Sequence, residues 1–227
     1  MTEEVAKKLM LSVAWDRDPL IVRELLMSGV DVNVRDKDGT NALMAAALAS
    51  DPEMVRLLLD FGANVNASAN DETTALHIAA FNGSVEVVRI LLQAGASVAA
   101  IDDTGMTPLM AAAKAGQVEI VRLLSAAGAD IEAADLSGRT SLIWAVLSNS
   151  SGALNLLIQS GAEPDHRSGT GETALMYAAM LGKTEAAKAL LAGGANPEIK
   201  NDHGQTAADL AVAYAHPEIA TLVGRSG

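Results

Sequence analysis

The chain has 227 residues, a formal net charge of −12 and no cysteine. The absence of cysteine excludes disulfides and thiolate metal sites. The acidic balance argues against nucleic acid as the main partner, because phosphate contacts need clustered cations. Apolar residues make up 50% of the chain and aromatic residues only 3%, so we expect a core of alanine, leucine and valine.

Neither a membrane span nor a secretion signal is expected. The longest apolar run extends from Ala42 to Ala49, well short of the roughly 18 residues that a membrane helix needs. The chain starts Met1-Thr2-Glu3-Glu4, without the basic start and apolar stretch of a signal peptide. We therefore expect a cytoplasmic protein that does not bind membranes.

A period of 33 residues runs through the chain. One series of glycines keeps this spacing without a gap, and a second series does so with Glu72 in place of one glycine. Such periodicity indicates a repeat architecture, here of about seven units that start near residues 3, 36, 69, 102, 135, 168 and 201. The first series consists of Gly29, Gly62, Gly95, Gly128, Gly161 and Gly194.

Each repeat predicts the same elements in the same order. A turn with glycine at its fourth position comes first, as at Gly105. An Asn or Thr suited to cap a helix follows, and then a short alanine-rich helix, as in 109–113. A second helix carries apolar residues at helical spacing, as in 85–92, and ends at a Gly-Ala pair whose glycine suits a left-handed C-cap. The expected caps are Asn41, Thr74, Thr107, Thr140, Thr173 and Thr206.

Two repeats depart from this pattern. Glu72 stands where a turn glycine is expected, which predicts strain or rearrangement in the third turn. In the fifth repeat, residues 149–152 read Asn-Ser-Ser-Gly. Because Ser and Gly are poor helix formers, we expect the second helix of this repeat to start late and the repeat to be the softest internal one. The first and seventh repeats are expected to be caps.

The segments 74–80, 107–113 and 206–211, together with 88–96, resemble the ankyrin repeat. The resemblance covers nearly the whole chain. It implies an all-α solenoid of turn–helix–helix units forming a single domain over residues 1–227, and a role in binding other proteins. The chain departs from the family at several positions. Pro108 is the only proline at its repeat position, and His77 is the only histidine at its repeat position.

No catalytic residue, metal site or cofactor is predicted. The four histidines fall at four different positions of the repeat, and His77 resembles the structural histidine of the family. A metal site formed by His166, Asp165 and Asp202 is conceivable, but no HExxH-type spacing supports it. No glycine-rich phosphate loop follows a strand, and the repeated carboxylates at the starts of second helices suit the helix dipole.

The family resemblance places the turn tips and first helices on a concave face. Aromatic residues concentrate there, and aromatic anchors are typical of binding hot spots. For Trp144 and Tyr177, core packing is the favoured alternative; for Trp15 and Phe81 the two interpretations are balanced. The predicted partner-binding residues are Trp15, Phe81, Lys114, Arg139, Trp144, Leu147, Arg167, Tyr177, Met180 and Tyr214.

The charge of the expected face differs from that of the chain. Seven acids and seven bases fall at its positions, and Lys114, Arg139 and Arg167 turn the balance positive between the fourth and sixth repeats. One interpretation is scattered solvated charge, of little energetic consequence. The other is a mildly basic, apolar patch for a partner segment.

The sequence therefore favours a protein-interaction scaffold that binds a partner protein on its concave face. One alternative is an inhibitor or immunity protein that masks an enzyme or toxin. Another is an engineered or reconstructed repeat scaffold without a natural partner. An enzyme is the least supported class.

Overall fold

The computed structural model describes Leu9, Val13 and residues 18–224. Trp15 and most of the expected N-terminal cap lie outside these residues. Within them the chain is entirely helical, and the only extended pairing consists of isolated bridges such as Arg35 with Asn41 at the base of a turn. The chain divides into two compact parts, Met1–Asp103 and Thr104–Gly227.

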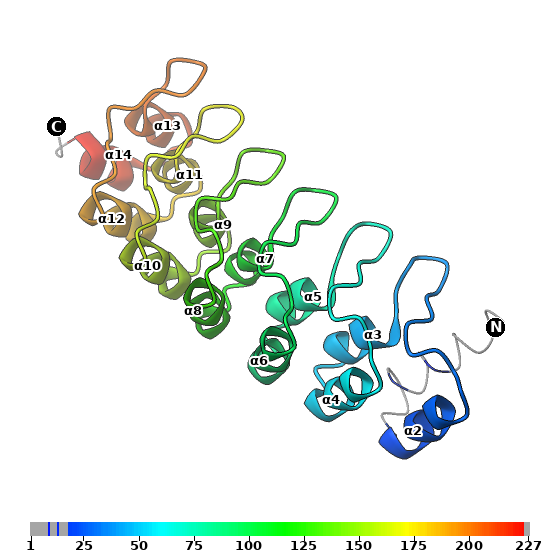
Figure 1. Ribbon diagram of the computed structural model, residues 1–227. Coiled ribbons are helices and arrows are strands. Elements are labelled where there is room, and N and C mark those ends of the chain that lie inside the picture. Colours follow the sequence, from blue (N-terminus) through cyan, green and yellow to red (C-terminus); the bar gives the residue numbers. More distant parts are fainter. Residues whose placement is uncertain (1–8, 10–12, 14–17, 225–227) are drawn as a thin grey trace. The chain divides into compact units, whose positions relative to one another are not determined.

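Helices come in pairs joined by tight turns, and successive pairs are separated by long hairpin turns (Figure 1). In both parts the described residues thus form the turn–helix–helix units that the 33-residue period predicts. The N-terminal part contains α2 (Pro19–Met27), α3 (Ala42–Leu48), α4 (Pro52–Asp60), α5 (Ala75–Asn82) and α6 (Val85–Gln93). The C-terminal part contains α7 (Pro108–Lys114), α8 (Val118–Ala126), α9 (Ser141–Leu147), α10 (Ser151–Gln159), α11 (Ala174–Met180), α12 (Thr184–Ala192), α13 (Ala207–Ala213) and α14 (Pro217–Gly224).

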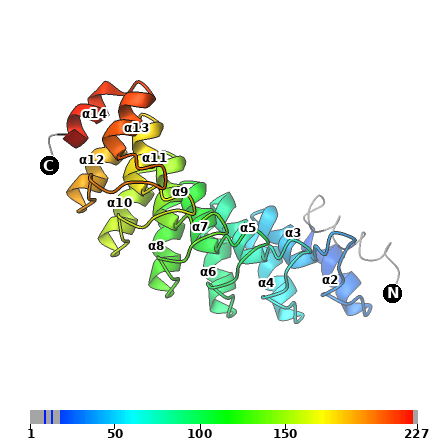
Figure 2. The ribbon, with the colours of Figure 1, turned by 90° about the horizontal axis from the view of Figure 1, so that it is seen from above.

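Within the C-terminal part the helices form two rows. The first helices α7, α9, α11 and α13 pack side by side, and the second helices α8, α10, α12 and α14 form the other row (Figure 2). Alanines such as Ala112, Ala145 and Ala178 are fully buried in the first row. Because alanine adds little bulk, these short helices can approach closely.

Five of the six first helices in the described residues are capped at their N-termini as expected. The Thr107 hydroxyl accepts a hydrogen bond from the Met110 N–H at 3.3 Å, and Thr173 and Thr206 cap α11 and α13 in the same way. Asn41 and Thr74 do so for α3 and α5. These bonds satisfy N–H groups that have no partner inside the helix. Thr140 is the exception, since its side chain makes no capping hydrogen bond.

Backbone hydrogen bonds join each hairpin turn to the next. The Leu136 N–H donates to the Thr104 carbonyl at 2.9 Å, and the Gly169 N–H donates to the Ser137 carbonyl at 2.8 Å. Within a turn, a side-chain oxygen at the first repeat position holds the loop. Asp135 Oδ1, for example, accepts from the N–H groups of Ser137 and Arg139. The turns are thereby a continuous, rigid part of each stack.

The two irregular repeats have different outcomes. Glu72 adopts φ +62°, the left-handed region that its glycine equivalents occupy, so the expected strain in that turn is present. The expected late start of the fifth repeat's second helix was wrong: α10 begins at Ser151, in register with Val118 of α8. Asn149 takes the left-handed conformation, at φ +58°, and the Ser150 hydroxyl caps the Ala153 N–H.

Candidate protein-binding surface

Trp144, predicted to contact a partner or to pack in the core, is mostly buried. It is 9% exposed, and its indole N–H donates to Asp135 Oδ2, with 3.1 Å between nitrogen and oxygen. The Asp135 side chain is 2% exposed. A buried indole normally finds such a hydrogen-bond partner, so Trp144 is chiefly a structural residue that positions the groups around it.

Two cations lie against the Trp144 ring. The Arg139 guanidinium carbon is 4.2 Å from the ring centroid and the Lys114 ammonium is 4.7 Å from it. Arg139 Nε also donates to Asp135 Oδ2 at 3.0 Å. Cation–π contacts contribute roughly 0.5–2 kcal/mol each, depending on how far they are desolvated. Lys114, Arg139 and Trp144 are thus brought together, as three parts of one cluster with Asp135.

Arg167 is engaged with the turn that follows it. Its Nη2 donates to Asp202 Oδ1 at 2.6 Å and its Nε to the Gly171 carbonyl at 3.3 Å. Arg35 occupies the equivalent repeat position in the N-terminal part and makes the same bond, from its Nε to the Gly39 carbonyl at 2.9 Å. The arginine at this position therefore ties successive turns together.

These pairings change the expected charge of the surface. The predicted positive balance counted Arg139 and Arg167, but each is paired with a carboxylate, Asp135 or Asp202. In the described part of the chain, Lys114 has no carboxylate within ion-pair distance. The local positive charge is therefore concentrated on this one ammonium group.

The C-terminal ends of the first helices form a strip in the C-terminal part that is apolar apart from one lysine. Lys114, Leu147 and Met180 hold the same repeat position at the ends of α7, α9 and α11; Lys114 is exposed and the other two are half-buried. The Ser148 hydroxyl donates to the Ala113 carbonyl at 2.9 Å and ties the ends of α7 and α9 together. We call Lys114, Leu147, Met180 and the adjacent Leu181, which is 43% exposed, the first-helix strip.

Tyr177 lies on α11 within the same row and is half-buried. Tyr214 caps the C-terminal end of α13 and is 56% exposed. Sequence reasoning did not single out Leu136, which is 81% exposed in the turn before α9. The signal was present, because Leu136 is the only leucine at its repeat position, which elsewhere holds Glu, Lys, Asn, Asp or Gly.

The N-terminal part presents its own pair of apolar residues at the strip position. Phe81, for which binding and core packing were balanced expectations, is 48% exposed, and Leu48 on the neighbouring first helix is 64% exposed. The Asn82 side chain donates to the Leu48 carbonyl at 3.2 Å and joins the two helix ends. Leu48 was missed although it lies 33 residues before Phe81.

Two of the four histidines have side-chain contacts within the repeat structure. His77, expected to be structural, is 4% exposed, and its Nδ1 accepts from the Thr74 N–H at 3.3 Å within a capping box. His166 Nε2 contacts the Gly138 carbonyl at 3.0 Å. Among the described residues, no group of three or more His, Asp or Glu side chains could hold a metal ion.

Glu172 is a buried carboxylate at the base of the turn before α11. Its Oε2 accepts from the hydroxyls of Ser168, at 3.0 Å, and Thr170, and its Oε1 accepts from the Asn201 amide at 3.4 Å. Burial alone raises its pKa, but hydrogen bonds from Thr170, Ser168, its own backbone and Asn201 together lower the pKa below the ordinary value. Glu172 therefore holds the turn in its ionised form.

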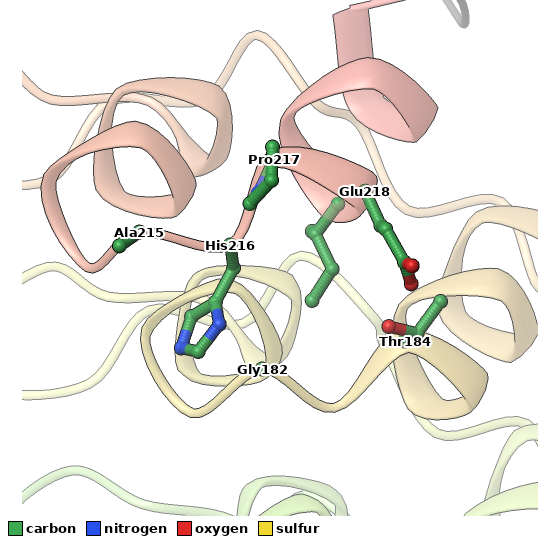
Figure 3. A pocket seen from close by; sticks show the side chains of 7 residues that line it. Gly182, Thr184, Ala215, His216, Pro217 and Glu218 are labelled. Atoms are coloured by element: carbon green, nitrogen blue, oxygen red, sulfur yellow. The ribbon is translucent and has the colours of Figure 1, made fainter.

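A pocket of about 210 Å³ lies between the turn after α11 and the turn after α13 (Figure 3). Thr184, His216 and Glu218 supply its polar side chains. The His216 ring lies over Gly182, where an added Cβ would be 2.6 Å from His216 Cε1. One imidazole and one carboxylate are fewer ligands than protein zinc or calcium sites use, so the pocket does not define a metal centre.

The comparisons with known proteins agree with this architecture. The family model for ankyrin repeats (3 copies) matches residues 9–102, 97–168 and 150–226. The chain therefore belongs to the ankyrin-repeat family, whose members are generally protein–protein interaction modules and typically not enzymes. No curated protein matches the chain.

A crystal structure of the ankyrin repeat domain of Bcl-3, a member of the IkappaB protein family, is similar throughout. The TM-score is 0.81 and the sequence identity 30%, over 94% of this chain and 97% of that one. No helix in the described residues is long and apolar enough to cross a membrane.

Proposed function

We propose that the chain, an array of about seven ankyrin repeats, binds a partner protein through the first helices and hairpin turns of its repeats. In the C-terminal part the contact surface is the first-helix strip, with Tyr177 and the Lys114–Trp144–Arg139 cluster beside it. In the N-terminal part it is the pair Leu48 and Phe81. The location that we expect from the sequence is cytoplasmic, and the partner is neither nucleic acid nor membrane.

The observation that carries this proposal is the exposure of large apolar side chains at one repeat position. Leu48 and Phe81 are 64% and 48% exposed, and Leu147 and Met180 hold the same position half-buried. The alanines one residue before them, such as Ala47 and Ala179, are fully buried. Before Leu147 the buried residue is Val146. Since these preceding residues close the stack, the exposed parts of the larger side chains are not used in folding, and partner binding gives them a role.

The structure adds a rigid frame to this surface. The turns are joined by backbone hydrogen bonds, and Trp144 and Glu172 are held by buried hydrogen bonds. A preorganised surface loses little conformational entropy on binding. An inhibitor or immunity protein would use such a surface to cover an enzyme or toxin, and an engineered scaffold without a natural partner would have none to bind.

Affinity capture from the source cell with matched variants tests the proposal. The test variant carries Leu147→Ser and Met180→Ser in adjacent first helices. The control carries Leu123→Ser and Leu156→Ser, two half-buried leucines at one repeat position of the second helices α8 and α10. We expect the test variant to lose a partner that wild type and control retain, with all three equally helical. A partner retained by the test variant and lost by the control would place binding on the second helices.

A further inference from the structure

The charges on the three neighbouring first helices α7, α9 and α11 are unusual for so acidic a chain. The sequences of α7, α9 and α11 are PLMAAAK, SLIWAVL and ALMYAAM. They contain one charged residue, Lys114, in a chain of net charge −12. A surface of this kind offers one positive charge beside a strip of apolar side chains.

Asp135, the carboxylate of the cluster, has no capacity left for Lys114. Asp135 Oδ1 accepts from the N–H groups of Ser137 and Arg139, at 2.8 and 3.0 Å. Its Oδ2 accepts from Arg139 Nε and Trp144 Nε1, at 3.0 and 3.1 Å. A carboxylate has about four lone-pair positions, and all four are used. The side chain is also 2% exposed, so Asp135 cannot serve as an ion-pair partner at the surface.

The Trp144 ring therefore holds two cations against one carboxylate, and the four-residue cluster carries a net charge of +1. Arg139 is committed to Asp135, and Arg167 is committed to Asp202. Among the described side chains, Lys114 contacts only the ring face, with its ammonium 4.7 Å from the centroid. It is exposed at the end of α7, so an incoming anionic group can reach it.

We infer that the partner segment binds the first-helix strip with a carboxylate on Lys114 and apolar side chains on Leu147 and Met180. The inference rests on the proposed function and adds the chemistry of the partner. Adjacent helices lie about 8–10 Å apart, a distance that an extended segment spans in about three residues. The segment therefore carries Asp or Glu about three residues from its first apolar anchor.

Selection of short random peptides on the full-length chain tests this inference. Wild type should recover peptides with an acidic residue near apolar ones. Lys114→Glu should instead recover peptides with Lys or Arg at the same place, because the charge of the site is reversed. Binding of a synthetic copy of a selected peptide is then followed by Trp144 fluorescence. A Trp15→Phe background leaves Trp144 as the only tryptophan, and its emission responds to Lys114 because the ammonium lies against the ring.

Lys114→Gln should weaken the binding of that peptide about tenfold or more. Lys114→Arg, which keeps the positive charge, should retain most of the wild-type affinity. Replacing the acidic residue of the peptide by its amide should weaken binding to wild type but not further weaken binding to Lys114→Gln. Because Lys114 is exposed, these variants are expected to fold normally, which circular dichroism checks.

The outcomes separate this inference from the proposed function. If Leu147→Ser with Met180→Ser abolishes peptide binding and Lys114→Gln does not weaken it, the proposed surface holds but the inferred contact between a carboxylate and Lys114 is wrong. If neither variant affects binding, the proposed surface is wrong as well. Recovery of peptides without any acidic preference would also overturn the inference.

Discussion

The indole N–H of Trp144 donates to the buried carboxylate of Asp135 across 3.1 Å. This bond joins a first helix to the hairpin turn that precedes it, and it sets the ring on which Lys114 and Arg139 lie. The proposed binding surface therefore depends on a buried polar contact beneath it. Disturbing that contact should affect both stability and binding.

Trp144→Phe should destabilise the chain by about 1–3 kcal/mol, because Asp135 loses a hydrogen-bond donor in a buried place and the smaller ring leaves space. Urea unfolding followed by circular dichroism measures this. The control is Leu136→Ala in the same turn, which should change stability by about 0.5 kcal/mol or less because Leu136 is 81% exposed. Equal effects of the two substitutions would contradict the buried role of Trp144.

Glu172 makes the stability of the chain depend on pH in a known direction. Its pKa is lowered in the folded chain, so its contribution is present above the unfolded-state value of about 4.3 and is lost as the pH falls through the folded value. The stability difference between wild type and Glu172→Gln should therefore shrink as the pH falls from neutral toward 3. A difference that stays constant or grows on acidification would refute this.

Ala215 stands at a left-handed position, φ +61°, that Gly116 and Gly182 occupy in earlier repeats. Ala215→Gly should stabilise the chain by about 0.5–1 kcal/mol. The left-handed conformation costs a Cβ-bearing residue about 1–2 kcal/mol, but part of this gain is lost because glycine loses more conformational entropy on folding. Thermal unfolding measures it. Ala213→Gly, at the exposed last residue of α13, is the control and should instead destabilise slightly, because glycine is a poorer helix former than alanine.

Gly152 lies inside α10, where glycine ordinarily weakens a helix by about 1 kcal/mol. Gly152→Ala should nevertheless fail to stabilise, because a Cβ there would be 2.7 Å from Val118 Cγ2 and valine is stiff about its first torsion. In a Val118→Ala background the clash is absent, so adding Gly152→Ala there should increase stability relative to Val118→Ala alone. A single Gly152→Ala substitution that stabilises the chain would show that the two helices adjust without cost.

The prediction that the fifth repeat is the softest internal one is untested. Its basis has changed, because α10 starts in register and is capped by Ser150. What remains is the poor helix propensity of Ser151, Gly152 and Asn155. Hydrogen exchange should therefore show less protection in residues 150–160, which include α10, than in residues 117–127, which include α8. Equal protection in the two segments would contradict the prediction.

The repeat architecture could be predicted from the sequence because it depends on period, caps and glycines, which are local signals. The start of α10 was predicted wrongly because Asn149 can adopt the conformation of the glycine it replaces, and composition does not reveal this. The pairing of Arg139 with Asp135 was also missed. Asp135 was not counted at the surface, and only side-chain geometry shows that it faces Arg139 and Trp144.

Hydrogen-exchange mass spectrometry of the complex with a captured partner tests the central claim most directly. On partner binding we predict increased protection at the C-terminal ends of α7, α9 and α11, around Lys114, Leu147 and Met180, with little change in α8 and α10. Protection confined to the second helices, with the first-helix strip exchanging as it does without partner, would contradict the account.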